Sequence, residues 1–247
     1  MFKGLEVVEK LIQDLERDEL LLDYVLSETV IRVDTTEILL LIYLPNSVRI
    51  EDELHKKTVH LDIDILNNSY KKVLQRLRGL FGKGERLYAR HTVVARVDKQ
   101  VVSEFLDEYH LNMPLKGKYR YGLFHDGELV SVAVFSGGRI MREIHEEFRS
   151  FELLRFCHKA DYLVIGGISK LLKAFIKDFK PNDIMTYSDR DWSQGVSLQK
   201  IGFVSEGTTE PNHFYIKNGK RLTYLDNKEK YDYIVTNRGS FKMKLYL

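Results

Sequence analysis

The amino-acid sequence predicts an α/β (α+β) fold, in which a mixed sheet with flanking helices follows a small α/β N-terminal region. Strand-like and helix-like patterns alternate irregularly along the chain, which is typical of a mixed sheet. A strong hairpin signal, Asp126-Gly127, lies between two apolar runs. With 247 residues, the chain can bury one large core or two modest ones.

The domain boundary has to be placed by a change of pattern, because the sequence contains no repeat, no low-complexity tract and only four prolines. The segment "FGKGERLY" at 81–88 sets two glycines among charged residues, as linkers do. We therefore predict an N-terminal region over 1–84 and a second domain over 85–247.

The N-terminal region begins with a predicted helix over 4–26, where apolar side chains recur at helical spacing. Two strands follow, "TVIRVD" at 29–34 and "EILLLIYL" at 37–44. The segment "TVHLDIDIL" at 58–66 alternates as a further strand, with His60, Asp62 and Asp64 on its solvent face. A basic helix from residue 70 closes the region.

The second domain has a clearer order of elements. It starts with the strand "HTVVARV" and the helix "DKQVVSEFLDEYH", and the hairpin strands "KYRYGLF" and "ELVSVAVF" flank Asp126-Gly127. Next come the strand "FELLRFC", a helix from about residue 167, the strand "DIMTYSD", the short helix "WSQGVSLQKI" and late strands around "GFVSEG" and "HFYIKNG". The order is therefore strand, helix, three strands, helix, strand, helix, two strands.

The helix from about residue 167 follows a pair of glycines in "YLVIGGISKLLKAF". Its apolar residues form one stripe, and Pro181 ends it. Gly166 and Gly167 leave the first backbone N–H groups uncovered, and these groups together with the helix dipole can hold a phosphate or pyrophosphate. Lys170 would add a positive charge. The alternative is that the two glycines only allow a tight turn from strand to helix.

The elements from 91 to 216 resemble the GNAT acyltransferase fold. In that family a loop of pattern R/Q-x-x-G-x-G/A before the central helix cradles the pyrophosphate of acetyl-CoA; "LVIGGISKLL" takes its place here, and "SLQKIGF" resembles a later family segment. The resemblance implies acetyl-CoA or another acyl-CoA as cofactor, with no metal. The residues implied to bind it are Ile165, Gly166, Gly167, Ile168, Ser169 and Lys170. Leu163, Ile168 and Leu198 depart from the pattern, where the family has Arg or Gln, a small residue, and often a tyrosine that protonates the departing thiolate.

A narrower resemblance covers about 85–247 and rests on "ELLRFC", "GGISKLLKAF", "YSDRDWSQG" and "IGF" in that order. This string is similar to the GNAT-like domain of bacteriophage homing endonucleases and, more distantly, of Mom-type DNA modification proteins. It implies Arg155 and Asp189 as catalytic-site residues, with Tyr187 in place of the tyrosine missing at Leu198. An ion pair between Arg155 and Asp189 across neighbouring strands is the alternative role.

The densest positive charge lies at 70–90, which holds seven basic residues and one acidic residue. One interpretation is a DNA-contacting helix and loop. Its candidate phosphate contacts are Lys71, Lys72, Arg76, Arg78, Lys83, Arg86 and Arg90. The other interpretation is the solvated face of an amphipathic helix.

Other function classes are disfavoured. The single cysteine, Cys157, excludes an intramolecular disulfide, and no CxxC or HExxH pattern suggests a structural zinc site. "IEDELHKK" at 50–57 resembles the end of a Vsr-like nuclease region, but the 49 residues before it are too short for that fold, so we expect at most a remnant. His55, His60, Asp62 and Asp64 would be the makeshift metal ligands of such a remnant. No run approaches the ~18 apolar residues of a membrane span, and the chain reads as cytoplasmic.

Two hypotheses of different classes follow. The first is an acyl-CoA-dependent transferase that acts on an amine or a nucleic-acid base, with the acidic segment at 143–147 as a candidate source of a general base. The second is a non-catalytic DNA-binding protein of phage or mobile-element origin that has lost this chemistry. The sequence leaves the oligomeric state and the acceptor open.

Overall fold

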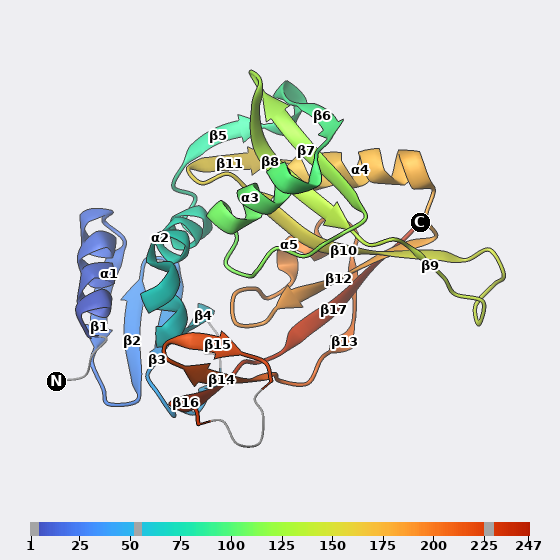
Figure 1. Ribbon diagram of the computed structural model, residues 1–247. Coiled ribbons are helices and arrows are strands. Elements are labelled where there is room, and N and C mark those ends of the chain that lie inside the picture. Colours follow the sequence, from blue (N-terminus) through green and yellow to red (C-terminus); the bar gives the residue numbers. More distant parts are fainter. Residues whose placement is uncertain (1–4, 52–55, 225–229) are drawn as a thin grey trace. The chain divides into compact units, whose positions relative to one another are not determined.

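The computed structural model describes residues 5–51, 56–224 and 230–247 (Figure 1). The chain forms two compact units. The first comprises residues 1–73, 188–195 and 208–241, and the second comprises 74–187, 196–207 and 242–247. The predicted fold class is confirmed, since both units combine helices with sheets. Residues 188–195 and 208–241 belong to the same unit as the N-terminal residues, and the domain boundary at 84/85 stays a prediction.

The first unit is built on a four-stranded sheet of order β1-β2-β3-β4. Its strands are β1 (Leu21–Val25), β2 (Val30–Thr35), β3 (Ile38–Tyr43) and β4 (Lys57–Asp62). β3 runs antiparallel to β2 and parallel to β4, and every residue of β3 is buried. The continuous apolar run "ILLLIY" is thus the central strand that such runs indicate.

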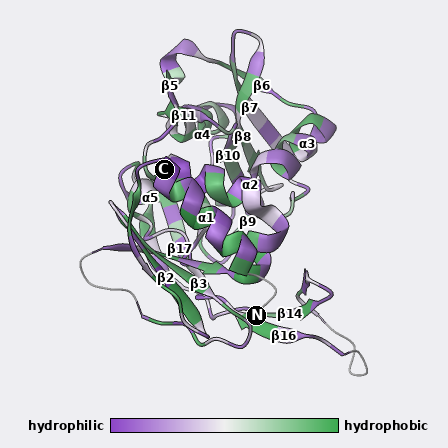
Figure 2. Cartoon of the chain, turned by 90° about the vertical axis from the view of Figure 1, so that its left-hand side faces the viewer, coloured by the Kyte–Doolittle hydropathy of each residue, from purple (hydrophilic) through white to green (hydrophobic). Residues whose placement is uncertain are grey.

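The helix predicted over 4–26 is shorter in the structure. α1 (Leu5–Arg17) buries Val8, Leu11 and Leu15, and Figure 2 shows the mixture of hydrophobic and hydrophilic residues around it. Glu19 then adopts a left-handed conformation with φ 59°, and the next residues form the edge strand β1. β1 obtains its backbone hydrogen bonds from β2. The spacing of apolar residues does not indicate that a segment pairs with another strand. The predicted helix was therefore wrong beyond Arg17.

A small C-terminal sheet completes the first unit. It has the order β15-β14-β16 and consists of β14 (His213–Lys217), β15 (Lys220–Leu222) and β16 (Tyr233–Thr236). Both pairings are antiparallel. From β15, Arg221 reaches β4 and the first turn of α2 (Ile63–Leu80), where it binds Asp62 and Asp64. This contact helps to hold a late segment of the chain on the N-terminal residues.

The contacts of Arg221 belong to a larger buried ionic network. Arg49 donates to both Asp62 carboxylate oxygens, at 2.6 and 2.9 Å, and to Asp191 Oδ2 at 3.1 Å. Asp62 and Asp64 are 3% and 4% exposed. The prediction that these residues lie on the solvent face of a strand was wrong. A buried carboxylate is tolerated only beside a positive charge, and no pattern in the sequence indicates that Arg49 and Arg221 supply it.

His60 is also buried, and its hydrogen bonds fix its protonation state. Arg238 donates to His60 Nε2 at 2.8 Å, and the Tyr43 hydroxyl lies 2.7 Å from His60 Nδ1. Because arginine has only donors, Nε2 must be the unprotonated nitrogen. His60 is therefore a neutral link between β4 and the segment at 237–239. No cluster of three or more potential metal-binding side chains occurs in the described parts of the chain; His55 lies outside them.

The second unit contains the main sheet, of order β13-β17-β12-β10-β8-β7-β6 with β9 added on β10. The first strands along the chain are β6 (Val93–Arg96), β7 (Tyr119–His125), β8 (Glu128–Phe135), β9 (Arg139–Ile140) and β10 (Arg149–His158). They are followed by β12 (Asp183–Asp189), β13 (Val204–Thr208) and β17 (Ser240–Tyr246). The hairpin predicted at Asp126-Gly127 joins β7 to β8, and both turn residues have positive φ, at 48° and 82°. These angles suit the type I′ turn that an Asp-Gly pair indicates.

Two helices cover opposite faces of this sheet (Figure 1). α3 (Lys99–Tyr109), capped by the Asp98 side chain, packs Phe105 and Leu106 in one cluster with Val132 and Val134 of β8. α4 (Gly167–Phe179) packs Phe175 on Phe135, with ring centroids 3.9 Å apart. Val134 and Phe135 are neighbours on β8, so their side chains point to opposite faces. A short helix, α5 (Val196–Gln199), follows β12. None of the described helices is both long and apolar enough to cross a membrane.

Candidate functional site

The parallel strands β10 and β12 separate within the second unit. Their pairing covers only Ser150–Glu152 on β10 and Asp183–Met185 on β12, although both strands continue. One side-chain hydrogen bond follows, from Thr186 Oγ1 to the Leu153 carbonyl at 2.8 Å. A strand edge that has lost its neighbour presents backbone donors and acceptors, which a ligand with amide groups can pair with.

Glu152 lies at the last paired position. Phe151 packs against Phe175 of α4, so Glu152 points to the other face of the sheet. Its side chain is half-buried, and burial raises the pKa of its carboxyl, against the opposing effect of Arg155 and Arg139. A carboxyl with a raised pKa at the point where two strands diverge is a candidate general base. The sequence interpretation missed it in favour of the acidic segment at 143–147, because one glutamate within an apolar strand is no local signal.

The N-terminus of α4 lies at the glycine pair. Gly166 is the N-cap residue, with φ 79° and ψ 7°, and no side chain caps the helix. The first bond within the helix runs from Lys170 N–H to the Gly166 carbonyl, so the N–H groups of Gly167, Ile168 and Ser169 precede it. Ile165 and Gly166 are exposed, and a Cβ added at Gly166 would have only the Ala89 Cβ as a near neighbour, at 3.8 Å.

Gly167 is a glycine for a different reason. A Cβ there would lie 2.9 Å from Cε1 of the His158 ring, which is too close for a real side chain. The His158 ring is held by Ser131, whose Oγ lies 2.6 Å from Nδ1. The two glycines thus have separate roles, since Gly167 allows close packing and Gly166 provides the left-handed turn.

The Lys170 side chain contacts a segment far away in the sequence. Its ammonium donates to the carbonyl oxygens of Ala89, at 2.8 Å, and of Thr92. Ala89 begins the short 3₁₀ turn η1 (Ala89–His91), and Thr92 directly follows this turn. The turn itself follows β5 (Glu85–Tyr88). β5 pairs in parallel with β11 (Tyr162–Ile165), the strand directly before Gly166. Lys170 therefore holds η1 beside the start of α4.

This arrangement places Arg90 near Gly166. Arg90 was assigned from sequence to the DNA-contacting cluster, yet it lies on η1, where its guanidinium stacks on Tyr88 at 4.8 Å and donates to His91. Tyr88 is the register partner of Ile165. Ala89, next in the chain, is the nearest neighbour of Gly166. Tyr88 and Arg90, both exposed, are thus the chain neighbours of the residue that lies beside Gly166.

The other predicted site residues have their own partners. Arg155 donates to the carbonyl oxygens of Met113 and Leu154. Asp189 accepts the Asp191 N–H, and Tyr187 is 46% exposed. An ion pair of Arg155 with Asp189 stays the alternative prediction. The catalytic roles assigned to Arg155, Asp189 and Tyr187 stay predictions.

The basic residues of 70–90 fall into separate groups. Lys71 and Arg86 are exposed, Lys72 is half-buried on α2, and Arg90 lies on η1. Arg76, Arg78 and Lys83 line a pocket of the second unit. Their joint contact with DNA stays a prediction.

His158 provides a test of the packing beside α4. Removal of its ring from water lowers the pKa of His158 to about 4, from an ordinary 6.5. Between these values the unfolded chain binds a proton that the folded chain does not, so stability falls as pH drops from about 6.5 to about 4. We expect a loss on the order of 3 kcal/mol. His158→Gln keeps a hydrogen-bonding group for Ser131 and should remove that part of the pH dependence of stability. Urea titrations at several pH values measure the free energy of unfolding, and an equal change with pH in both proteins would contradict the prediction.

Known proteins resemble this chain in structure but not in sequence. No protein-family model matches the chain, and no curated protein sequence matches it. Solved structures with a similar fold include acetyltransferases. The ribosomal-protein-S18-alanine N-acetyltransferase from Escherichia coli aligns with a TM-score of 0.44 and 11% identity over 63% of this chain and 93% of its own.

Two further similar structures contain acetyl-CoA or CoA. A GNAT family acetyltransferase from Elizabethkingia anophelis with acetyl-CoA bound has a TM-score of 0.38 and 12% identity, over 64% of this chain and 99% of its own. A Bacillus subtilis acetyltransferase in complex with CoA has a TM-score of 0.38 and 18% identity, over 63% and 99%. These TM-scores lie below 0.5, so the support for a function comes from the residues of this chain.

Proposed function

We propose that the chain is an acyl-CoA-dependent N-acyltransferase whose acceptor is an amine or the amino group of a nucleic-acid base. The observation that carries the proposal is the exposed N-terminus of α4, where Gly166 turns the chain without covering the first N–H groups. Such a terminus favours a pyrophosphate through its free donors and its dipole. When bound, acetyl-CoA would supply the activated acyl group.

Residues near this terminus would give acetyl-CoA a positive charge that the sequence motif does not contain. Leu163 stands where the family has Arg or Gln, so the motif itself offers no side-chain donor to a phosphate. Arg90, held on η1 beside Gly166, would provide the missing positive charge. Lys170 would act as a positioning residue through its bonds to Ala89 and Thr92, not as a phosphate contact.

The separated strands would hold the reacting groups. Unpaired backbone groups of β10 beyond Leu153 would bind the amide-containing part of the cofactor, and Glu152 would accept the proton of the attacking amine. Rate enhancement would come mainly from holding amine and thioester together and from N–H groups directed at the developing oxyanion. Leu198 has no acidic proton, so Tyr187 is the proposed donor to the departing thiolate.

Binding of acetyl-CoA tests this proposal directly. In calorimetric titrations we expect micromolar binding by the wild-type chain and at least about tenfold weaker binding by Gly166→Ala, because a Cβ would stand over the uncovered donors. Gly127→Ala is the matched control: Gly127 has nearly the same φ, 82°, in the β7–β8 turn, with no atom near its Cβ position. Equal weakening by both variants would mean that backbone strain alone causes the effect.

The DNA-binding alternative predicts a different pattern. It requires strongly salt-dependent binding to duplex DNA and no response to acetyl-CoA. Wild-type protein that fails to bind acetyl-CoA at millimolar concentration but binds DNA in this way would overturn the transferase proposal.

A further inference from the structure

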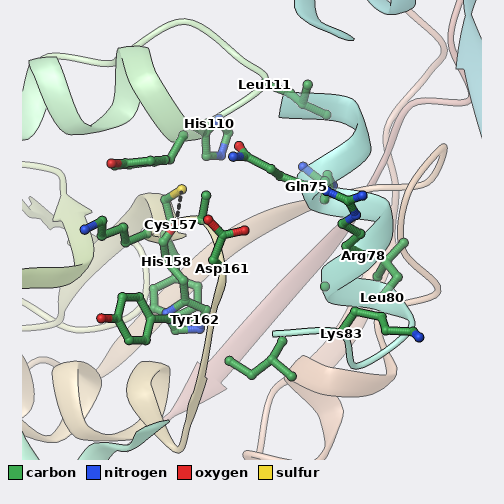
Figure 3. Close-up of a pocket in the computed structure, with 17 residues that line it drawn as sticks. Gln75, Arg78, Leu80, Lys83, His110, Leu111, Cys157, His158, Asp161 and Tyr162 are labelled. Atoms are coloured by element: carbon green, nitrogen blue, oxygen red, sulfur yellow. Dashed lines mark hydrogen bonds between the residues drawn. The ribbon is translucent and has the colours of Figure 1, made fainter. Parts of the chain in front are cut away.

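The second unit contains a pocket of about 370 Å³ that the proposed transferase chemistry does not use. It is enclosed by the last turns of α2, the end of α3, the end of β10 and the loop into β11 (Figure 3). Its volume is in the range of small-molecule sites. Figure 3 shows Gln75 and Arg78 on the α2 wall and Cys157 and Asp161 on the opposite wall, with His110 at one end.

The walls of this pocket are fixed to one another by backbone contacts. The Glu85 N–H donates to the Asp161 carbonyl at 2.7 Å, and β5 pairs with β11 directly after it. A Cβ at Gly84 would lie 2.9 Å from the Asp161 carbonyl oxygen, so only glycine allows this approach. The pocket is therefore built into the fold, as binding sites with ordered walls usually are.

The charge of the lining is strongly positive. Arg76, Arg78 and Lys83 come from the α2 wall and the turn after it, and Lys159 comes from the opposite wall, where it forms an ion pair with Glu128. Asp161 is the only acid among the described residues that line the pocket, and its carboxylate points into the space between the walls (Figure 3). A net positive lining of this kind favours an anion.

The lining also includes aromatic rings. Tyr109 from the end of α3, Phe156 from β10 and Tyr162 from β11 all contribute to the pocket. Rings add contact area and stacking surfaces for a planar ligand. We propose that this pocket binds a small aromatic anion. Its phosphate or carboxylate group faces Arg78, and its ring system contacts these aromatic side chains. The lining includes Phe156, Cys157 and His158 of β10 and Leu163 before Gly166, so the pocket adjoins the proposed acyl-CoA site.

The chain's single cysteine makes the pocket directly testable, because Cys157 lines it. The rate of Cys157 alkylation by iodoacetamide can be followed in the full-length protein with adenosine 5′-monophosphate, phenyl phosphate or uncharged adenosine as the probe. We expect the two phosphates to slow alkylation in a saturable way and adenosine to have no effect. Adenosine as effective as its phosphate, or no protection by either phosphate up to about 10 mM, would overturn the proposal.

Two variants are expected to change the affinity for phosphate in opposite directions. Together they distinguish recognition of charge from a general disturbance of the pocket. Arg78→Gln should raise the phosphate concentration needed for half-protection about tenfold or more, since a charge-assisted contact is lost. Asp161→Asn should lower it, because the only acid in the described lining is removed while asparagine tolerates the left-handed conformation at this position, φ 70°. Arg86→Gln, an exposed residue of β5 outside the lining, is the control.

Each variant is accepted only if its thermal unfolding matches the wild type. Equal changes in Arg78→Gln and Asp161→Asn would contradict an anion site. Protection by duplex DNA at lower concentrations than by the mononucleotide would also overturn the proposal, since the residues would then belong to a nucleic-acid surface. Acetyl-CoA titrations do not enter this test, so its failure leaves the transferase proposal unaffected.

Discussion

Replacement of Asp62 by alanine is expected to destabilise the first unit by about 3–5 kcal/mol, the usual effect of removing one partner from a buried ion pair. Asp62 accepts two hydrogen bonds from Arg49 and one from Arg221, and its side chain as a whole is 4% exposed. Its loss leaves two half-buried guanidinium groups with less negative charge around them. Since whole domains are stable by only about 5–15 kcal/mol, this change approaches the limit of folding.

Urea denaturation followed by far-UV circular dichroism measures this effect. Asp34→Ala is the matched control, because Asp34 lies on β2 of the same sheet and pairs with Lys56 at the surface, where the side chain is 32% exposed. Surface pairs contribute about 0–1 kcal/mol. A loss for Asp62→Ala no larger than for Asp34→Ala would mean that the ionic network does not stabilise the unit.

The second large effect is expected at Glu152. If Glu152 accepts the proton of the acceptor amine, Glu152→Gln should lower kcat by about 10²–10⁴-fold while KM for acetyl-CoA changes little. The wild-type rate should fall as the pH drops through the raised pKa of Glu152, because the protonated carboxyl cannot act as a base. The variant should lose that limb of the pH profile.

The measurement follows release of the CoA thiol with a panel of primary amines and nucleosides as acceptors. Glu104→Gln, an exposed carboxylate of α3, serves as the control, and Glu146→Gln tests the acidic segment that the sequence suggested. Unchanged kcat in Glu152→Gln together with a lower kcat in Glu146→Gln would indicate that the general base lies in the acidic segment at 143–147, not on β10.

The sequence predicted elements whose cause is local. The apolar stripe and Pro181 predicted α4, which ends at Phe179, and the Asp126-Gly127 pair predicted the turn between β7 and β8. Both succeed because helical spacing and turn conformation depend on residues a few positions apart. The same reasoning located the glycine turn before α4, in which Gly166 is the left-handed residue.

The candidate site was predicted only in part. Gly166 and the N-terminus of α4 came from the sequence, but the contacts of Lys170 with Ala89 and of Ala89 with Gly166 did not. Lys170 is one turn from Gly166 along the helix, yet its ammonium is held by carbonyls some eighty residues earlier in the chain. Glu152 could not be singled out, because its raised pKa comes from burial between strands.

By itself, the sequence determined the mixed α/β class, most helices and strands of the second unit, and the glycine turn. Only the tertiary structure decided that residues 208–241 complete the first unit and that His60, Asp62 and Asp64 are buried. The physical reason is that a buried charge is tolerated only where an opposite charge reaches it. Here Arg49 and Arg221, the partners of Asp62, lie up to 159 positions away along the chain, and a distance of that kind leaves no periodic pattern.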